Sequence, residues 1–230
     1  MSKEFLYDLY TKFKSNKKVK YPDIIIVDES KYTNYWAQVN SNELLSSEYI
    51  LHVNPDLYLQ NEDFIKMIAW HEFTHISDGV AFASDLSNED FVTLMSSYSE
   101  FHATYEATLY LLKNNRYNPP KLSNPDIMSI DNYSKILAYD YNEAIWKAYV
   151  RKARGIDYLC KEMYYYFGYA KAIHDFDHSY DVSLLFYRLP SKYIDTVKRL
   201  HVALTRKSIN YNNIIECTND FNTMIVNVHM

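Results

Sequence analysis

The chain has 230 residues, 48% of them hydrophobic, and a formal net charge of −5. This length suits one domain, with or without a small appended lobe, and the hydrophobic content excludes a disordered chain. No basic block dominates the sequence, so a nucleic-acid partner is not expected. The chain contains neither the apolar core of a signal peptide nor a run of about 18 apolar residues. We therefore expect a cytoplasmic protein without a membrane partner.

The first part of the chain is predicted to form a helix and a small sheet. Apolar residues recur at helical spacing over residues 3–15. Short β-branched and aromatic runs then predict strands at 23–28, 35–39 and 49–53. Pro55 follows the last run, and proline cannot continue a strand ladder. The strand at 49–53 could hold an extended peptide at its edge.

Two long helices are expected next. Asn61 can cap the first, which should end near Gly79 or within two turns after it. Ser87 and Asp90 form a capping-box-like start for the second helix, which should reach Lys113. Only three glycines and six prolines occur in the whole chain, which favours long helices over many hairpins.

The second half of the chain has the pattern of helices almost throughout. It begins after a connector at 114–126 that is rich in asparagine and proline. Helices are predicted at 130–153, 156–174, 190–207 and, more weakly, 211–217. The β-branched run at 224–228 predicts a short final strand. A small sheet followed by helices indicates an α+β fold.

The clearest chemical signal is the segment His-Glu-Phe-Thr-His at residues 71–75. Positions i and i+4 share one helix face, so His71 and His75 can bind one ion, and zinc readily accepts imidazole nitrogen. Glu72 lies about 100° further round the helix and should point at a water beside the ion rather than at the ion. Alternatively, both histidines are ordinary residues of a buried helix face.

A catalytic zinc site needs a third protein ligand. Glu100 is the strongest candidate, because the small Ala103 and Ala107 follow it along the same helical stripe. Small residues there would let this helix approach the first one closely. Four other side chains remain alternatives as the third ligand: Glu106, Asp78, Asp85 and His102.

The segment at 71–75, followed by Glu-Phe-His-Ala at 100–103, resembles the gluzincin metallopeptidases, which carry HExxH and a downstream glutamate. Over residues 22–113 the chain is most similar to the ImmA/IrrE family. The integral-membrane CAAX proteases have a similar run, but with aspartate where this chain has Thr104. The resemblance implies a cytoplasmic bacterial or phage protein, often from a mobile element, and some such proteins cleave repressor-type regulators.

The resemblance also implies a minimal zincin core at residues 1–113, with a three- or four-stranded sheet and two metal-binding helices. Residues 114–230 would form a helical extension packed on it. The implied function is a zinc metallopeptidase with one Zn²⁺ per chain, a peptide or protein substrate, and Glu72 as general base. A non-catalytic zinc-bound regulatory module is the alternative, and a helical scaffold without metal is another.

Several other polar residues are weaker candidates. Asp78 lies on the same helical stripe as the two histidines and could orient one of them. His174 and His178 form a second i, i+4 pair that could provide another donor or metal site, and His52 could face the cleft. A tyrosine often stabilises the oxyanion in zincins, but the presence of 24 tyrosines leaves that choice open.

Overall fold

The computed structural model describes residues 2–16, 24–29, 35–40, 44–46, 48–114, 156–176, 178 and 191–229. The fold is α+β, as the sequence predicts. The strands are β1 (Ile24–Asp28), β2 (Ala37–Asn40) and β3 (Glu48–Val53). The longer helices are α1 (Lys3–Asn16), α2 (Glu62–Phe82), α4 (Ser96–Asn114), α6 (Ile156–Phe176), α7 (Ser191–Thr205) and α8 (Tyr211–His229). Three short helical segments are η1 (Pro55–Leu59), α3 (Asn88–Asp90) and η2 (Phe91–Met95).

The sheet is mixed and has the strand order β1-β3-β2. β3 pairs in parallel with β1 and antiparallel with β2, so both of its edges are occupied. The expectation that residues 49–53 offer an edge to a peptide is therefore wrong. β2 is an outer strand, and it lies against α2.

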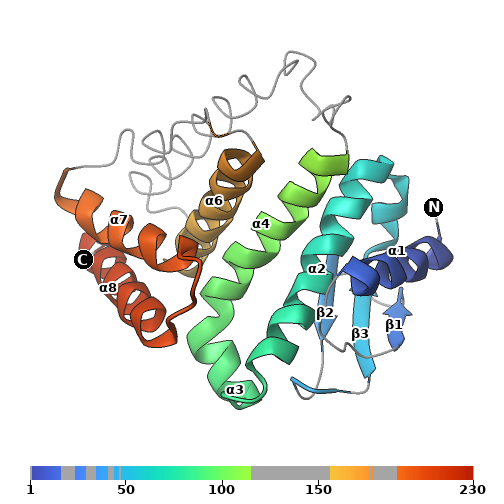
Figure 1. The fold of residues 1–230 in the computed structure, drawn as a ribbon, viewed down its shortest axis with the longest axis horizontal. Helices are drawn as coiled ribbons and strands as arrows, with labels where there is room; N and C mark the ends of the chain where they lie inside the picture. The colour runs from blue at the N-terminus through green and yellow to red at the C-terminus, as the bar shows by residue number, and fades with distance from the viewer. Residues whose placement is uncertain are drawn as a thin grey trace.

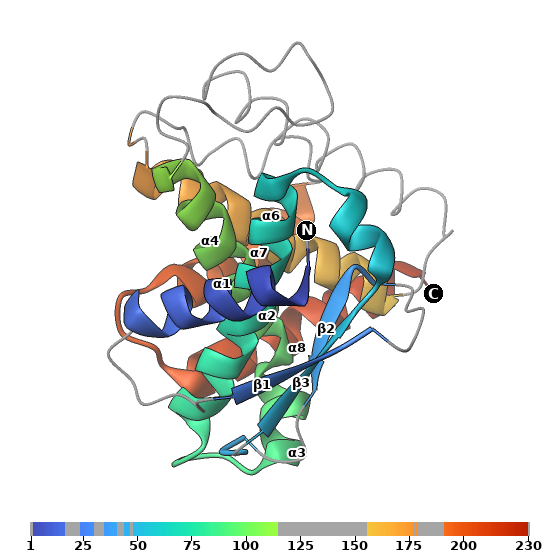
Figure 2. The same cartoon turned by 90° about the vertical axis from the view of Figure 1, so that its right-hand side faces the viewer.

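One face of the sheet forms a core with α1, α2 and the end of α4. Side chains alternate along the strands, and Ile25, Leu51 and Val53 point into this core, where they are almost fully buried. Figure 2 shows α1 lying across α2 beside the strands. Phe73 of α2 packs edge-on against Tyr10 of α1, with ring centroids 5.0 Å apart. These contacts fix the rotation of α2 about its own axis.

The helices α2, α4 and α6 run side by side, with the sheet next to α2 and with α7 and α8 beyond α6 (Figure 1). A second core fills the space among α4, α6, α7 and α8 and reaches the end of α2. Phe167, Leu200 and Phe221 are fully buried in it. α4 contributes to both cores, and α6 packs directly on the helix that carries Glu100.

Glycine at position 168 allows α6 to approach α4 closely. A Cβ atom at Gly168 would lie 2.6 Å from the carbonyl oxygen of Phe101 and 2.8 Å from Cβ of Thr104. Carbon atoms favour separations of about 3.5–4.0 Å, so a larger residue would push the two helices apart. Gly168 therefore sets how closely the side chains of α6 can reach those of α4.

Capping contacts confirm the predicted starts of two helices. Asn61 caps α2 by accepting a hydrogen bond from the Phe64 N–H at 2.9 Å. Ser87 accepts one from the Asp90 N–H at 3.1 Å. The helical run that follows passes from α3 through the π-helical η2 into α4 and ends at Asn114, close to the predicted end.

The end of the chain differs from its prediction. Residues 224–228 belong to α8 and do not form a strand. Ile214, Cys217 and Phe221 are buried at helical spacing, and this stripe carries the helix well past the predicted end at 217. The helix therefore continues through the β-branched residues at 224–228.

The structure agrees closely with the helices predicted at 156–174 and 190–207. The predicted connector at 114–126 and the helix at 130–153 lie outside the described residues. Among the helices that the structure describes, none combines the length and the apolar character needed to cross a membrane.

Candidate metal centre

The two histidines lie on the side of α2 that faces α4 and α6. The neighbouring residue Trp70 packs against two helices: it stacks on Tyr110 near the end of α4 with centroids 3.7 Å apart, and it meets Phe13 of α1 edge-on at 5.0 Å. Residues one position apart on a helix point about 100° away from each other. Because Trp70 is anchored in the core, the direction of His71, and of His75 one turn later, is fixed.

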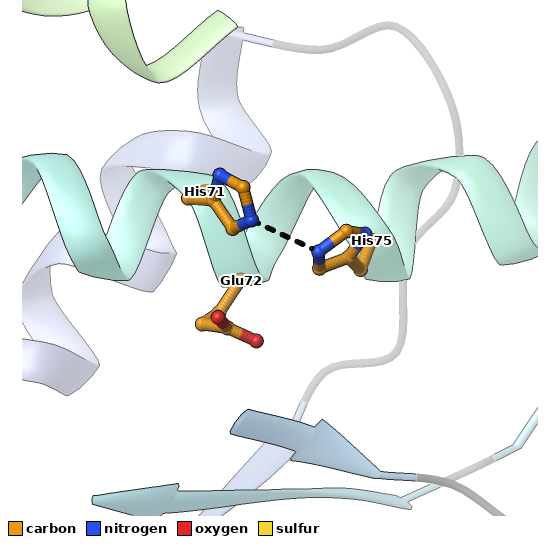
Figure 3. A group of neighbouring side chains, drawn as sticks. All are labelled: His71, Glu72 and His75. Atoms are coloured by element: carbon orange, nitrogen blue, oxygen red, sulfur yellow. Dashed lines mark hydrogen bonds between the residues drawn. The ribbon is translucent and has the colours of Figure 1, made fainter. Parts of the chain in front are cut away.

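The ring nitrogens of the two histidines converge. Nε2 of His71 and Nε2 of His75 lie 3.1 Å apart, and the ring planes are nearly perpendicular, at 84° (Figure 3). Two such nitrogens share a hydrogen bond when one carries a proton, and they can bind one ion when neither does. Glu72 is close as well, and one atom from each of the three residues lies within 4.8 Å of the others.

α4 brings Glu100 to the same point. Its Oε2 lies 3.3 Å from His71 Nε2 and 3.8 Å from His75 Nε2. Tetrahedral zinc with nitrogen and oxygen ligands at about 2.0–2.2 Å separates its ligand atoms by about 3.4 Å. The separations among His71 Nε2, His75 Nε2 and Glu100 Oε2 are 3.1, 3.3 and 3.8 Å, which lie on either side of this value. The donor atoms of His71, His75 and Glu100 therefore fit a tetrahedral ion with one open position.

The length of α2 makes this meeting possible. The helix continues past Gly79 and ends at Phe82, before the chain reverses into the run that leads to α4. Because α4 runs antiparallel to α2, a shorter α2 would place Glu100 beyond the histidines. Ala103 and Ala107, on the stripe that continues from Glu100, are both buried.

Glu72 points from α2 towards the sheet (Figure 3). Its Oε2 accepts a hydrogen bond from the Val39 N–H of β2 at 2.9 Å. This bond ties one carboxylate oxygen to the outer strand. The two carboxylates thus have different neighbours. Glu100 lies against both ring nitrogens, and Glu72 lies between the histidines and β2.

Tyr165 of α6 also lies at the site, and the sequence alone does not single it out. Its phenol makes a hydrogen bond to the Glu100 carboxylate, and its ring centroid lies 5.9 Å from that of His71. Burial and the charge of Glu100 raise the pKa of Tyr165, so the phenol stays protonated and donates this bond. Gly168, a glycine inside a helix rich in tyrosine, was the available signal, because it indicates close helix packing.

A cleft of ≈ 450 Å³ opens over these residues. Its walls come from β2, α2, α4 and α6, and both histidines and both glutamates line it. Trp36, Met67 and Ile68 give part of the wall an apolar character. An apolar cleft with a few convergent polar groups is typical of a ligand-binding or catalytic site.

A chain of polar contacts leads from His75 away from the cleft. His75 Nδ1 lies 2.8 Å from Ser99 Oγ, and Ser99 donates a hydrogen bond to Asp78 Oδ2 at 2.9 Å. Asp78 Oδ1 lies 2.7 Å from His102 Nδ1, and Glu106 lies 3.6 Å from His102 Nε2. Burial by itself would lower the pKa of His102, but Asp78 and Glu106 raise it to about 10, so this imidazole is a cation. Asp78, His102 and Glu106 are thus engaged with one another.

The remaining candidates from the sequence lie elsewhere. His52 Nδ1 is 3.0 Å from Asp28 Oδ2 on the neighbouring strand, and His52 does not line the cleft. His178 Nδ1 lies 2.9 Å from the backbone oxygen of His174, a contact at the end of α6. Asp85 is exposed in the turn after α2. Within the described residues, the group that could hold a metal ion is His71, Glu72 and His75 on α2, and Glu100 of α4 lies within 3.8 Å of both histidines.

The likeness to the gluzincins rests on the cluster of His71, Glu72 and His75 on α2, within an α+β fold. The cluster has the geometry of an HExxH motif on a helix. No protein family, no curated protein and no solved structure matches this chain.

Proposed function

We propose that this chain is a zinc-dependent metallopeptidase that binds one Zn²⁺ ion. The observation that carries the proposal is the convergence of His71 Nε2, His75 Nε2 and Glu100 Oε2, at separations of 3.1, 3.3 and 3.8 Å. Two imidazoles and one carboxylate are donors that zinc accepts. Three protein ligands with one open position are typical of catalytic zinc, whereas structural zinc has a closed shell of four.

The ion would supply Lewis acidity, which polarises the scissile carbonyl and lowers the pKa of water towards about 7. Glu72 would take the proton from that water and pass it to the leaving amine. The Val39 N–H holds Glu72 Oε2 at 2.9 Å and so keeps the carboxylate beside the histidines. This position, next to the ligand atoms but tied to the sheet, supports a role as base for Glu72.

Tyr165 would stabilise the negative charge that develops on the carbonyl oxygen. Its neutral phenol is a hydrogen-bond donor that already reaches Glu100, close to the proposed ion. A donor aimed at the developing oxyanion is worth about 10²–10³-fold in kcat in well-studied hydrolases. Because Tyr165 comes from α6, the C-terminal helices would supply part of the catalytic machinery.

The outer edge of β2 would hold the substrate. Asn54 N–H donates to the Trp36 carbonyl at 3.0 Å, which marks these residues as a hydrogen-bonded pair of the antiparallel ladder. Alternation then directs the main-chain groups of Ala37 and Val39 away from β3, and Val39 indeed donates to Glu72 on that side. An extended peptide that pairs with this edge would run past Glu72.

The test is peptide hydrolysis before and after removal of the metal. Because the resemblance implies regulatory proteins as substrates, the substrates should include a repressor-type regulator as well as a broad peptide library. We expect cleavage by the zinc-loaded protein, no cleavage after chelation, and recovery on adding one equivalent of zinc. Cleavage that survives complete chelation would contradict the proposal. A zinc-loaded protein that cleaves nothing would favour a non-catalytic regulatory module.

A further inference from the structure

Ser99 and Asp78 connect His75 to the interior of the protein. Ser99 precedes the proposed ligand Glu100 on α4, and it is 3% exposed. Its Oγ lies 2.8 Å from His75 Nδ1 and 2.9 Å from Asp78 Oδ2. The Asp78 side chain is 4% exposed. The serine therefore bridges two residues of α2 from the neighbouring helix.

The chemistry of these groups decides the direction of each hydrogen bond. An ionised carboxylate only accepts hydrogen bonds, and a serine hydroxyl has one proton to donate. Asp78 accepts from Ser99 at Oδ2 and from His102 Nδ1 at Oδ1, 2.7 Å away. Because the Ser99 proton is directed to Asp78, the Ser99 oxygen must accept the proton of His75 Nδ1.

We propose that Ser99 and Asp78 are positioning residues that hold His75 as its Nδ1–H tautomer. The lone pair of His75 Nε2 then points at the proposed metal position, where the donor atoms of His71 and Glu100 converge. The inference rests on the proposed metal site. A neutral imidazole with its proton on Nε2 would have to exchange tautomers before it could bind an ion through that atom. Contacts between a ligand histidine and a carboxylate commonly fix the tautomer and ring orientation. Here a serine stands between the two.

The bridge also couples the two helices that carry the ligands. α2 provides His75 and Asp78, and α4 provides Ser99 next to Glu100. A shift of α4 along α2 would break the hydrogen bonds of Ser99 and move Glu100 in the same motion. The hydrogen bonds of Ser99 to His75 and Asp78 therefore hold the ligand atoms in place before an ion arrives.

The first test is the tautomer of His75 in the metal-free protein, measured by ¹⁵N–¹H correlation NMR of the imidazole rings. We expect the Nδ1–H form in the wild type and loss of that preference in Ser99→Ala. Ser96→Ala is the matched control, because Ser96 is exposed in the first turn of the same helix. A wild-type His75 with its proton on Nε2, or an unchanged tautomer in Ser99→Ala, would overturn the inference.

The second test is zinc affinity, measured by competition with a chromogenic chelator. Partners of metal ligands typically contribute 10–100-fold in affinity, so Ser99→Ala should lose about that factor, and Ser96→Ala should lose none. Asp78→Asn keeps the shape but removes the charge, and it should also weaken zinc binding. Wild-type affinity in both Ser99→Ala and Asp78→Asn would refute the bridge. If the wild type itself binds no zinc, the proposed function fails, whereas the NMR result still decides the tautomer.

Discussion

Replacing Glu72 by glutamine should leave zinc binding intact and slow peptide hydrolysis about 10²–10⁴-fold, the usual contribution of general acid–base catalysis. Glutamine has nearly the same shape, and its amide oxygen can still accept the hydrogen bond from the Val39 N–H. It cannot take up a proton at neutral pH, so only the step that needs a base is lost. The measurement is kcat/KM on a library-derived peptide, with the zinc content determined on the same sample.

Glu62→Gln is the matched control for this prediction. Glu62 is in the first turn of the same helix, where it is exposed and pairs with Lys66. Its replacement should change neither zinc content nor hydrolysis. Wild-type activity in Glu72→Gln would show that the base is another group. Loss of zinc from Glu72→Gln would show that Glu72 binds the ion.

Replacing Glu100 by alanine should abolish most of the zinc affinity. Even residues that only touch a metal ligand contribute about 10–100-fold, so removal of a ligand should cost more than about a hundredfold. The structural reason is that Oε2 of Glu100 lies within 3.8 Å of the Nε2 atoms of both His71 and His75. Two histidines alone leave a weak site. The measurement is chelator competition at fixed pH, followed by thermal unfolding to show that the variant is folded.

Glu106→Gln is the control for Glu100→Ala. Glu106 lies on the same helix but is 3.6 Å from His102 and makes no ion pair with His71 or His75 among those the structure describes. Its replacement should keep zinc affinity within a few-fold of the wild type. The opposite ranking, with zinc lost from Glu106→Gln and kept by Glu100→Ala, would overturn the assignment of the third ligand.

The parts of the structure that the sequence predicts well are those set by local chemistry. Asn61 and Ser87 start helices because their side chains satisfy backbone N–H groups within three residues. The spacing of His71 and His75 alone places both rings on one helix face. Glu100 is also close to both histidines, as its spacing in the sequence predicts, because its approach depends mainly on the lengths of two helices and the turn between them.

The parts that the sequence did not predict depend on packing between residues that are far apart in the chain. Tyr165 reaches Glu100 because Gly168 brings α6 close to α4. Gly168 indicates close helix packing, but it does not show which of the 24 tyrosines lies at the site. The expectation that residues 49–53 offer a free edge is wrong because β3 lies between β1 and β2, and strand order is decided by tertiary pairing. At residues 224–228, the buried stripe of α8 outweighed the β-branched composition.

The most direct test of the metal centre is the metal content of the protein purified without chelator. Elemental analysis should find one zinc per wild-type chain and none in a His71→Ala, His75→Ala double variant, because the two Nε2 atoms, 3.1 Å apart, form the core of the site. Zinc-free wild-type protein that also fails to take up zinc on dialysis would contradict the account. So would a double variant that still holds one equivalent.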